Sequence, residues 1–249
     1  MRSKGLIKLS SCLALLLLAT AVWADQDPND PGLADTLGFS TPAIYYPLGY
    51  GLTGVVIGIR FFNDNQVSAI VCPFLMGGPV TYDSVSFSGS RVDYLQYTTS
   101  NYNFLQSKLL IGAVPVEEAL IPPGSGSLCN IYFTLNDTVG PITLDTTFFE
   151  PSNHLSFVTG EPPVDYVPRF TAGVFPILVY LPGDATGDRK VDLADLIFLV
   201  NYVFKGGPAP LIVVAGDANG DCKTDLGDII FLVNYVFKGG TTPLPGCVP

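Results

Sequence analysis

The sequence predicts an all-β sandwich of the jelly-roll kind, followed by a small α domain made of two loop–helix repeats. The sandwich is predicted because residues 40–181 consist of short apolar stretches interrupted by Gly, Pro, Asn and Asp. The α domain is predicted because two acidic segments, 33 residues apart, each lead into an apolar stretch that stops at Gly-Gly. The 21 Pro and 26 Gly residues argue against long helices elsewhere in the chain.

The N-terminal segment Met1–Ala24 has the features of a secretory signal peptide. Three basic residues precede an apolar run at 13–19, and small residues end at a predicted cleavage site after Ala24. The apolar run is too short to cross a membrane. We therefore expect a secreted, extracellular protein that begins near Asp25. The following segment, 25–39, contains Asp-Pro-Asn-Asp-Pro-Gly and is expected to be a flexible leader.

Strands of the sandwich are expected where apolar and polar residues alternate. Val55, Ile57, Ile59 and Phe61 alternate in one stretch, and residues 128–135 alternate in another. Further strands are expected at 67–75, 80–88, 91–97, 104–112, 141–149 and 170–180. These stretches predict a sandwich of eight or nine strands.

The composition excludes several classes of function. The chain has 12 Lys and Arg against 22 Asp and Glu, a formal net charge of -10, which argues against nucleic acid or an anionic membrane surface as a partner. Hydrophobic residues make up 48% of the chain, which supplies a core and excludes wholesale disorder. The single histidine, His154, excludes a site that needs several imidazole groups.

Four cysteines follow the predicted signal peptide: Cys72, Cys129, Cys222 and Cys247. An even number in an exported chain favours disulfides, and four cysteines allow three pairings. We favour Cys72–Cys129 and Cys222–Cys247, because each bond then stays within one predicted domain. The alternative is that some of the four remain free thiols.

The two C-terminal repeats, 184–207 and 217–240, differ at five of 24 positions, and each begins with an acidic loop. The loop spacing is that of calcium coordination, with side-chain ligands at positions 1, 3, 5, 9 and 12 and a backbone carbonyl at position 7. Carboxylates so close together repel unless a cation neutralises them, and an all-oxygen ligand set favours Ca²⁺ over a transition metal. The predicted ligands of the two calcium ions are Asp184, Thr186, Asp188, Lys190, Asp192 and Asp195 in the first loop and Asp217, Asn219, Asp221, Lys223, Asp225 and Asp228 in the second.

Two positions depart from an ideal calcium loop. Thr186 replaces Asn or Asp at position 3, so the first site is expected to be the weaker one. Position 6 is usually Gly in EF-hands, whereas here it is Arg189 in one loop and Cys222 in the other. The loops are therefore not those of ordinary paired EF-hands.

Each loop leads into a helix that is apolar on almost all sides. On a helical projection, Leu193, Ile197, Val200 and Phe204 fall on one stripe of the first helix, whereas Phe198 and Tyr202 fall on a separate arc. Two such helices in so small a unit cannot hide every face from water, so part of their surface is expected to be a docking site. The competing interpretation is a compact pair that buries one arc and leaves the other exposed.

Tandem loops with Asp at positions 1, 5, 9 and 12, each followed by one helix and without the entering helix of an EF-hand, resemble a dockerin domain over residues 183–240. The resemblance implies calcium-dependent docking onto a cohesin-type protein module, with positions 10 and 11 of each loop helping to choose the partner. The near-identical helices are consistent with two binding orientations. The implied partner-binding residues are Leu193, Ala194, Phe198, Tyr202, Leu226, Gly227, Phe231 and Tyr235.

The predicted sandwich is similar to a cohesin-like domain in the stretches 54–64, 80–90, 121–137 and 142–149, in order and in spacing. In cohesins the strands that correspond to those of Cys72 and Cys129 lie side by side, so the resemblance implies a disulfide between these two residues. The domain boundaries are then a signal peptide at 1–24, a flexible leader at 25–39, a cohesin-like sandwich at 40–181 and a dockerin-like domain at 182–249.

These features predict a secreted, non-catalytic interaction protein whose calcium-bound module docks onto a cohesin-type partner or onto another copy of the chain. One alternative is a carbohydrate-binding module attached to the dockerin-like unit. Another is a glycoside hydrolase, which needs only two carboxylates. His154 lies in a polar turn and no nucleophile–base motif is present, so we expect no enzyme. The sugar-stacking candidates are Tyr45, Tyr46, Tyr50, Tyr94, Tyr97 and Tyr102.

Overall fold

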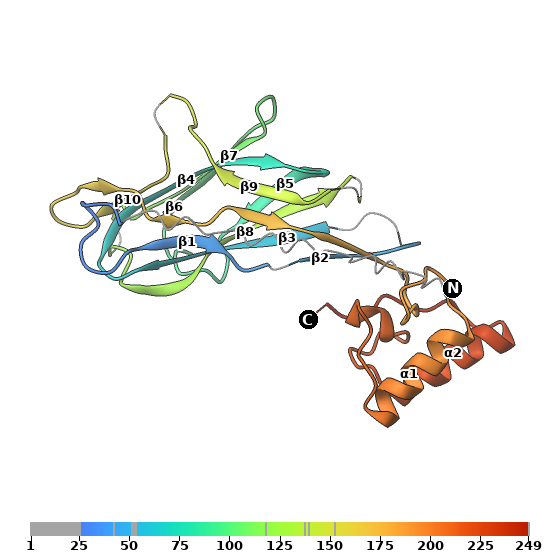
Figure 1. The fold of residues 1–249 in the computed structure, drawn as a ribbon. Helices are drawn as coiled ribbons and strands as arrows, with labels where there is room; N and C mark the ends of the chain where they lie inside the picture. Colours follow the sequence, from blue (N-terminus) through green and yellow to red (C-terminus); the bar gives the residue numbers. More distant parts are fainter. Residues whose placement is uncertain are drawn as a thin grey trace, which may run out of the picture.

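A computed structural model describes residues 26–248 except residues 42, 51–53, 118, 137, 139 and 152, so the predicted signal peptide lies outside the described residues. The chain forms a β-sandwich followed by a small unit with two α-helices (Figure 1). No helix in the described part of the chain is long and apolar enough to cross a membrane.

The first sheet of the sandwich has five strands in the order β12-β1-β3-β8-β5. Its pairings are antiparallel except that of β1 with β12, which is parallel. The long central pair β3–β8 sets the register, since Gly54 lies opposite Thr134 and Asn63 opposite Gly124. The strands are β1 (Thr36–Phe39), β3 (Gly54–Asn63), β5 (Val80–Ser86), β8 (Gly124–Leu135) and β12 (Arg169–Phe170).

The second sheet has seven strands and is centred on β4. One edge of β4 pairs with β7, which in turn pairs with β6. The other edge of β4 pairs with β9 and β10, and these pair with β13 and β11 respectively. The strands are β4 (Val67–Gly77), β6 (Tyr97–Asn103), β7 (Lys108–Val114), β9 (Ile142–Thr146), β10 (Ser156–Thr159), β11 (Asp165–Tyr166) and β13 (Gly173–Phe175).

The core lies between these two sheets because their strands alternate as the sequence predicts. In β8, Ile131, Phe133 and Leu135 are buried, whereas Tyr132 and Thr134 face outward. Side chains from both sheets form one hydrophobic cluster that runs through the sandwich. The predicted all-β sandwich is confirmed.

Three predicted strands are wrong in position or extent. The strand expected at 170–180 is divided into β12, β13 and β14 (Ile177–Tyr180), which belong to three different sheets. Residues 91–94 form a turn, and β6 begins only at Tyr97. This turn is held by Arg91, whose guanidinium lies 4.2 Å from the ring centre of Phe61 and donates to the Gly124 carbonyl. The strand expected at 104–112 begins at Lys108, because Phe104 and Leu105 occupy the exposed turn before β7. Apolar residues in a solvent-exposed turn misled the sequence prediction.

The segment expected to be a flexible leader is ordered wherever it is described. Thr36–Phe39 form β1 inside the first sheet. Before it, the Gln26 amide donates to the Asp30 carbonyl, and the Asp27 carboxylate accepts from the backbone N–H of Val167. Side-chain hydrogen bonds fix this segment, and composition alone does not reveal them.

A two-stranded parallel ribbon leads from the sandwich to the helical unit (Figure 1). It consists of β2 (Ile44–Pro47) and β14 (Ile177–Tyr180). Tyr180 packs against a short 3₁₀-helix, η1 (Val213–Gly216), in a small hydrophobic cluster. The hydroxyl of Tyr50 donates to the Pro243 carbonyl. These contacts join the two parts of the chain.

The helical unit contains α1 (Leu193–Lys205) and α2 (Leu226–Lys238). Each helix begins after an aspartate N-cap and ends at a glycine in the left-handed conformation, as the Gly-Gly stops predict. The helices share a small core in which Leu199 and Leu232 are fully buried. The loop–helix repeat of the sequence is therefore also a structural repeat.

Candidate metal and docking site

The first aspartate of each acidic loop organises the backbone of that loop. Asp184 accepts hydrogen bonds from the backbone N–H groups of Gly187 at 2.7 Å, Asp188 at 3.2 Å and Arg189 at 2.7 Å. The equivalent Asp217 accepts the same three bonds from Gly220, Asp221 and Cys222. The two loops therefore adopt one backbone geometry.

The twelfth residue of each loop closes the loop onto its helix. Asp195 accepts from the N–H of Thr186 at 3.0 Å and from the N–H of the N-cap Asp192 at 2.9 Å. Asp228 accepts the equivalent bonds in the second loop. The Thr186 hydroxyl lies within hydrogen-bond distance of both Asp184 and Asp195, so positions 1 and 12 face each other. Loop closure and helix start thus use the same carboxylate.

These closing carboxylates are buried at a cost. Asp195 and Asp228 have no exposed surface. Burial raises the pKa of each above its usual value, and hydrogen bonds from backbone N–H groups offset this only in part. A hard cation beside the carboxylates would compensate their buried charge. The chemistry of positions 1 and 12 therefore fits a calcium ion.

The carboxylates at positions 5 and 9 lie at the exposed rim of each loop. Asp188 accepts from the N–H of Lys190, and Asp192 accepts from the N–H of Ala194. Asp221 and Asp225 repeat these bonds in the second loop. Within the described residues, no three carboxylates of one loop come within 4.8 Å of one another. Each loop therefore has buried carboxylates at positions 1 and 12 and exposed ones at positions 5 and 9, without gathering three of them into one close group.

Position 6 has the left-handed backbone conformation that usually requires Gly. Its φ angle is 68° at Arg189 and 70° at Cys222. Such a conformation costs a residue with a side chain roughly 1–2 kcal/mol. The sequence departs from the EF-hand pattern here, and the loops keep the backbone geometry nonetheless.

The second loop is tied to the C-terminal tail. The structure contains the predicted disulfide Cys222–Cys247. The N–H of Cys247 also donates to Asp217 at 3.1 Å, and the N–H of Leu244 donates to the Ala218 carbonyl at 2.9 Å. The tail therefore covers the loop that holds Asp217.

The other predicted disulfide is wrong, because Cys72 and Cys129 are both buried free thiols. Cys72 lies on β4 of the second sheet and Cys129 on β8 of the first. The family resemblance implied that these two strands lie side by side. They belong instead to opposite sheets of the sandwich. Burial raises the pKa of Cys129 to about 12.

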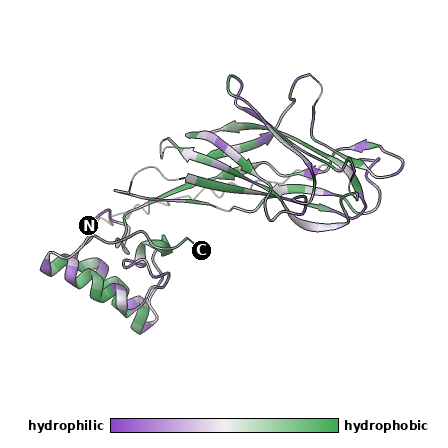
Figure 2. Cartoon of the chain, turned by 180° about the vertical axis from the view of Figure 1, so that it is seen from behind, coloured by the Kyte–Doolittle hydropathy of each residue, from purple (hydrophilic) through white to green (hydrophobic). Residues whose placement is uncertain are grey.

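The helices expose the same apolar stripe twice, and Figure 2 shows that hydrophobic residues dominate both helices. We call the row of three exposed apolar residues on each helix its apolar stripe. Equivalent residues of the two repeats are exposed to nearly the same fraction. They are Leu193 (52%) and Leu226 (49%), Ile197 (54%) and Ile230 (53%), and Phe204 (59%) and Phe237 (60%).

The predicted partner-binding residues fall partly on this stripe. Leu193, Leu226 and Ala194 are exposed, and Gly227 is half-buried. Phe198 and Phe231 pack against the core of the helical unit, and Tyr202 and Tyr235 are half-buried. The exposed Ile and Phe residues of the stripe were not among the predicted contacts, although the helical periodicity places them on the same face.

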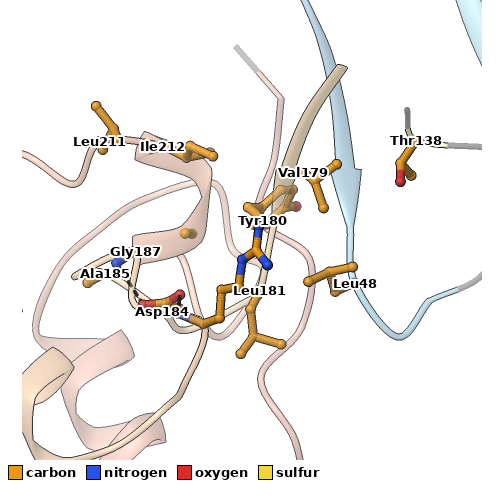
Figure 3. A pocket seen from close by; sticks show the side chains of 12 residues that line it. Leu48, Thr138, Val179, Tyr180, Leu181, Asp184, Ala185, Gly187, Leu211 and Ile212 are labelled. Atoms are coloured by element: carbon orange, nitrogen blue, oxygen red, sulfur yellow. Dashed lines mark hydrogen bonds between the residues drawn. The ribbon is translucent and has the colours of Figure 1, made fainter. Parts of the chain in front are cut away.

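A cleft separates the first loop from the β2–β14 ribbon (Figure 3). Leu48, directly after β2, and Tyr180 of β14 line it on one side, and Asp184 lines it from the loop. The dashed line in Figure 3 is the hydrogen bond from Gly187 to Asp184. The first loop therefore borders the sandwich, whereas the second borders the C-terminal tail.

The residues considered for other functions are dispersed. Tyr45 and Tyr46 lie on β2 and Tyr50 contacts the C-terminal tail, whereas Tyr97 and Tyr102 lie on β6 of a different sheet. The six tyrosines do not share one element. The side chains of His154 and Asp165 are largely exposed and lie 3.6 Å apart.

No protein-family model matches the chain, and no curated protein matches it. Among solved structures it is similar to the seventh ScaB type I cohesin from Pseudobacteroides cellulosolvens, with 14% identity over 60% of this chain and 95% of that chain and a TM-score of 0.48. It is also similar to a chain of the Coh-OlpC-Doc435 complex, a type I cohesin–dockerin complex from Clostridium thermocellum, with 12% identity, 60% and 96% coverage and a TM-score of 0.48.

A third similar structure is a non-cellulosomal cohesin from the hyperthermophilic archaeon Archaeoglobus fulgidus, with 13% identity, 59% and 92% coverage and a TM-score of 0.43. Because these TM-scores are below 0.5, the sandwich is identified from its own strand order and register.

Proposed function

We propose that this protein is a non-catalytic interaction protein whose C-terminal unit, closed by two calcium ions, docks onto a cohesin-type protein module. The observation that carries the proposal is the duplicated apolar stripe, because each copy follows a loop with the same hydrogen bonds. A row of large, exposed apolar side chains on each of two helices is typical of a site that a partner covers.

Calcium supports this function through the start of each helix. Asp195 is both a predicted calcium ligand and the partner of the N-cap Asp192. An ion that holds Asp195 therefore also fixes the first turn of α1 and the orientation of the stripe. Calcium outside cells is abundant, so sites of modest affinity would be filled constitutively and act as structural staples.

The repeat supports two equivalent modes of docking. Leu193, Ile197 and Phe204 on α1 have counterparts on α2 with nearly equal exposure. A partner that recognises one stripe can therefore recognise the other after the unit is turned. If the sandwich of a second copy is the partner, contacts are heterologous and copies link head to tail into open chains.

The proposal is tested with the full chain, a purified type I cohesin module and calorimetric titration. We expect binding in Ca²⁺ and none in EGTA. Replacing both Ile197→Lys and Ile230→Lys disrupts both stripes, and we expect affinity to fall at least about tenfold, or ~1.4 kcal/mol. Leu211→Lys is the matched control, since Leu211 is 92% exposed outside the helices.

Self-association is measured on the same proteins by sedimentation velocity. Calcium-dependent species larger than the monomer that disappear in the double variant identify a second copy as the partner. A chain that stays monomeric and binds no cohesin module in Ca²⁺ contradicts the proposed function.

A further inference from the structure

The start of β1 lies at the end of the sandwich that is remote from the helical unit (Figure 1). Three carboxylates converge beside it. Asp30 and Asp35 come from the loop before β1, and Asp64 comes from the turn after β3. One oxygen from each residue lies within 4.8 Å of the other two. Asp30 is 6% exposed and Asp35 is 1% exposed, so two of the three charges are almost completely removed from water. We call this group the Asp30 cluster.

The backbone holds the Asp30 cluster in place. The N–H of Asp35 donates to Asp30 at 2.9 Å, and the N–H of Asp64 donates to Asp35 at 3.0 Å. The hydroxyl of Tyr166 donates to the second oxygen of Asp35, and the N–H of Leu33 donates to Asp64. The three carboxylates are therefore positioned by groups from three separate parts of the chain.

One oxygen of the cluster has no partner. Oδ1 of Asp30 is buried and accepts no hydrogen bond, which is rare for a charged group. A carboxylate oxygen in this position costs free energy unless something else compensates it. The unpaired oxygen is a second observation, separate from the spacing of the three carboxylates, that points to a ligand-binding site.

The surrounding cations do not compensate the cluster directly. The Arg91 guanidinium donates hydrogen bonds to the side-chain oxygen of Asn63 at 2.9 Å and to the Gly124 carbonyl at 2.8 Å. Arg169 attracts Asp30 without forming an ion pair, and in the part of the chain described here no lysine or arginine pairs with the three carboxylates. Burial is the largest cause that raises the pKa of Asp35 to about 6, and the neighbouring carboxylates of Asp30 and Asp64 also raise it.

We propose that Asp30, Asp35 and Asp64 bind a calcium ion at a further site, separate from the two C-terminal loops. The ligands are all carboxylate oxygens, which suits a hard cation. Calcium–oxygen distances are about 2.4 Å, so ligands on opposite sides of one ion lie about 4.8 Å apart. This separation equals the limit within which the three oxygens fall. The flexible coordination of Ca²⁺ also accepts water and further oxygen atoms.

The ion would fasten the N-terminal loop to the sandwich. Two ligands precede β1, the third follows β3, and Tyr166 links Asp35 to β11. The site is independent of the docking function, because its residues lie outside the helical unit. It gives the acidic segment before β1 a structural purpose.

The test counts calcium ions bound to the full chain by equilibrium dialysis at neutral pH. Asp30→Asn keeps an oxygen that can accept from the N–H of Asp35 and removes one charge. We expect this variant to bind one ion fewer per chain than the wild type. Asp165→Asn is the matched control, because Asp165 is exposed at the same end of the sandwich, and we expect it to bind as many ions as the wild type. Equal numbers for wild type and Asp30→Asn overturn the proposal.

A second readout does not depend on that variant folding well. Tb³⁺, which replaces Ca²⁺, is excited through a nearby tyrosine, and Tyr166 contacts the cluster directly. We expect Tyr166→Phe to lower the Tb³⁺ emission of the full chain while the number of bound calcium ions stays the same. Unchanged emission in Tyr166→Phe contradicts the assignment. A cluster neutralised by a bound proton instead gives no cluster-dependent Tb³⁺ signal.

Discussion

Removing the Cys222–Cys247 disulfide should destabilise the helical unit and leave the sandwich intact. The bond joins residues 25 apart in the sequence, and the enclosed segment contains all of α2. Cross-linking a segment of this length lowers the entropy of the unfolded chain by about 12 cal/mol/K, which corresponds to about 3.5 kcal/mol at room temperature. For a unit of this size, the midpoint of thermal unfolding then falls by roughly 14–28 °C.

The perturbation is the double variant Cys222→Ser with Cys247→Ser, and reduction of the wild type should reproduce it. A second double variant, Cys222→Gly with Cys247→Ser, separates two effects. Cys222 has a φ of 70°, which Gly adopts without strain. We expect the Gly variant to recover roughly 1 kcal/mol relative to the Ser variant.

Thermal unfolding is followed by the far-ultraviolet circular dichroism of α-helices, because α1 and α2 are the α-helices of the described residues. The Ca²⁺ affinity proposed for the first loop should stay the same. The Ca²⁺ affinity proposed for the second loop should fall, because Cys247 no longer positions its N–H at Asp217. An unfolding midpoint of the helices that is unchanged in the Ser variant would refute the reasoning.

Two further predictions concern the core and the remaining thiols. Leu232→Ala should cost about 2–5 kcal/mol of helical-unit stability, because Leu232 is fully buried between the helices, whereas Leu211→Ala should change stability by less than about 0.5 kcal/mol. Denaturant unfolding checks both, and equal effects would contradict the packing described here. Cys72 and Cys129 should not react with a thiol reagent in the native chain, because burial removes access and raises the pKa of Cys129 to about 12. Cys72 and Cys129 should both react after unfolding without reductant, and neither would react if these two residues formed a disulfide.

The C-terminal unit could be predicted from the sequence because its determinants are local. The aspartate N-caps and the Gly-Gly stops each lie within one repeat, and the Cys222–Cys247 bond lies within the predicted C-terminal domain. Helical periodicity also placed Leu193, Ile197 and Phe204 on one face. The predicted partner contacts nevertheless included Phe198, which packs against the core, instead of the exposed Ile197 and Phe204.

The features that sequence reasoning missed depend on distant parts of the chain. The order of β1 and of the loop before it depends on pairing with β3 and on hydrogen bonds from Asp35 to Asp64 and Tyr166. The state of Cys72 and Cys129 depends on which sheet each strand joins. Neither is encoded in a local pattern, because strand order is decided by packing of the whole sandwich.

Calcium removal tests the proposed function most directly. The measurement is the thermal unfolding of the helices in the full chain, in saturating Ca²⁺ and after chelation with EGTA. At an ion concentration of about 100 times the dissociation constant, each occupied loop adds about 2.7 kcal/mol, so two loops raise the stability of the helical unit by about 5 kcal/mol. We expect the midpoint to fall markedly after chelation. An identical midpoint and identical helicity in both conditions would show that Asp184–Asp195 and Asp217–Asp228 close without metal, and calcium-dependent docking would be excluded.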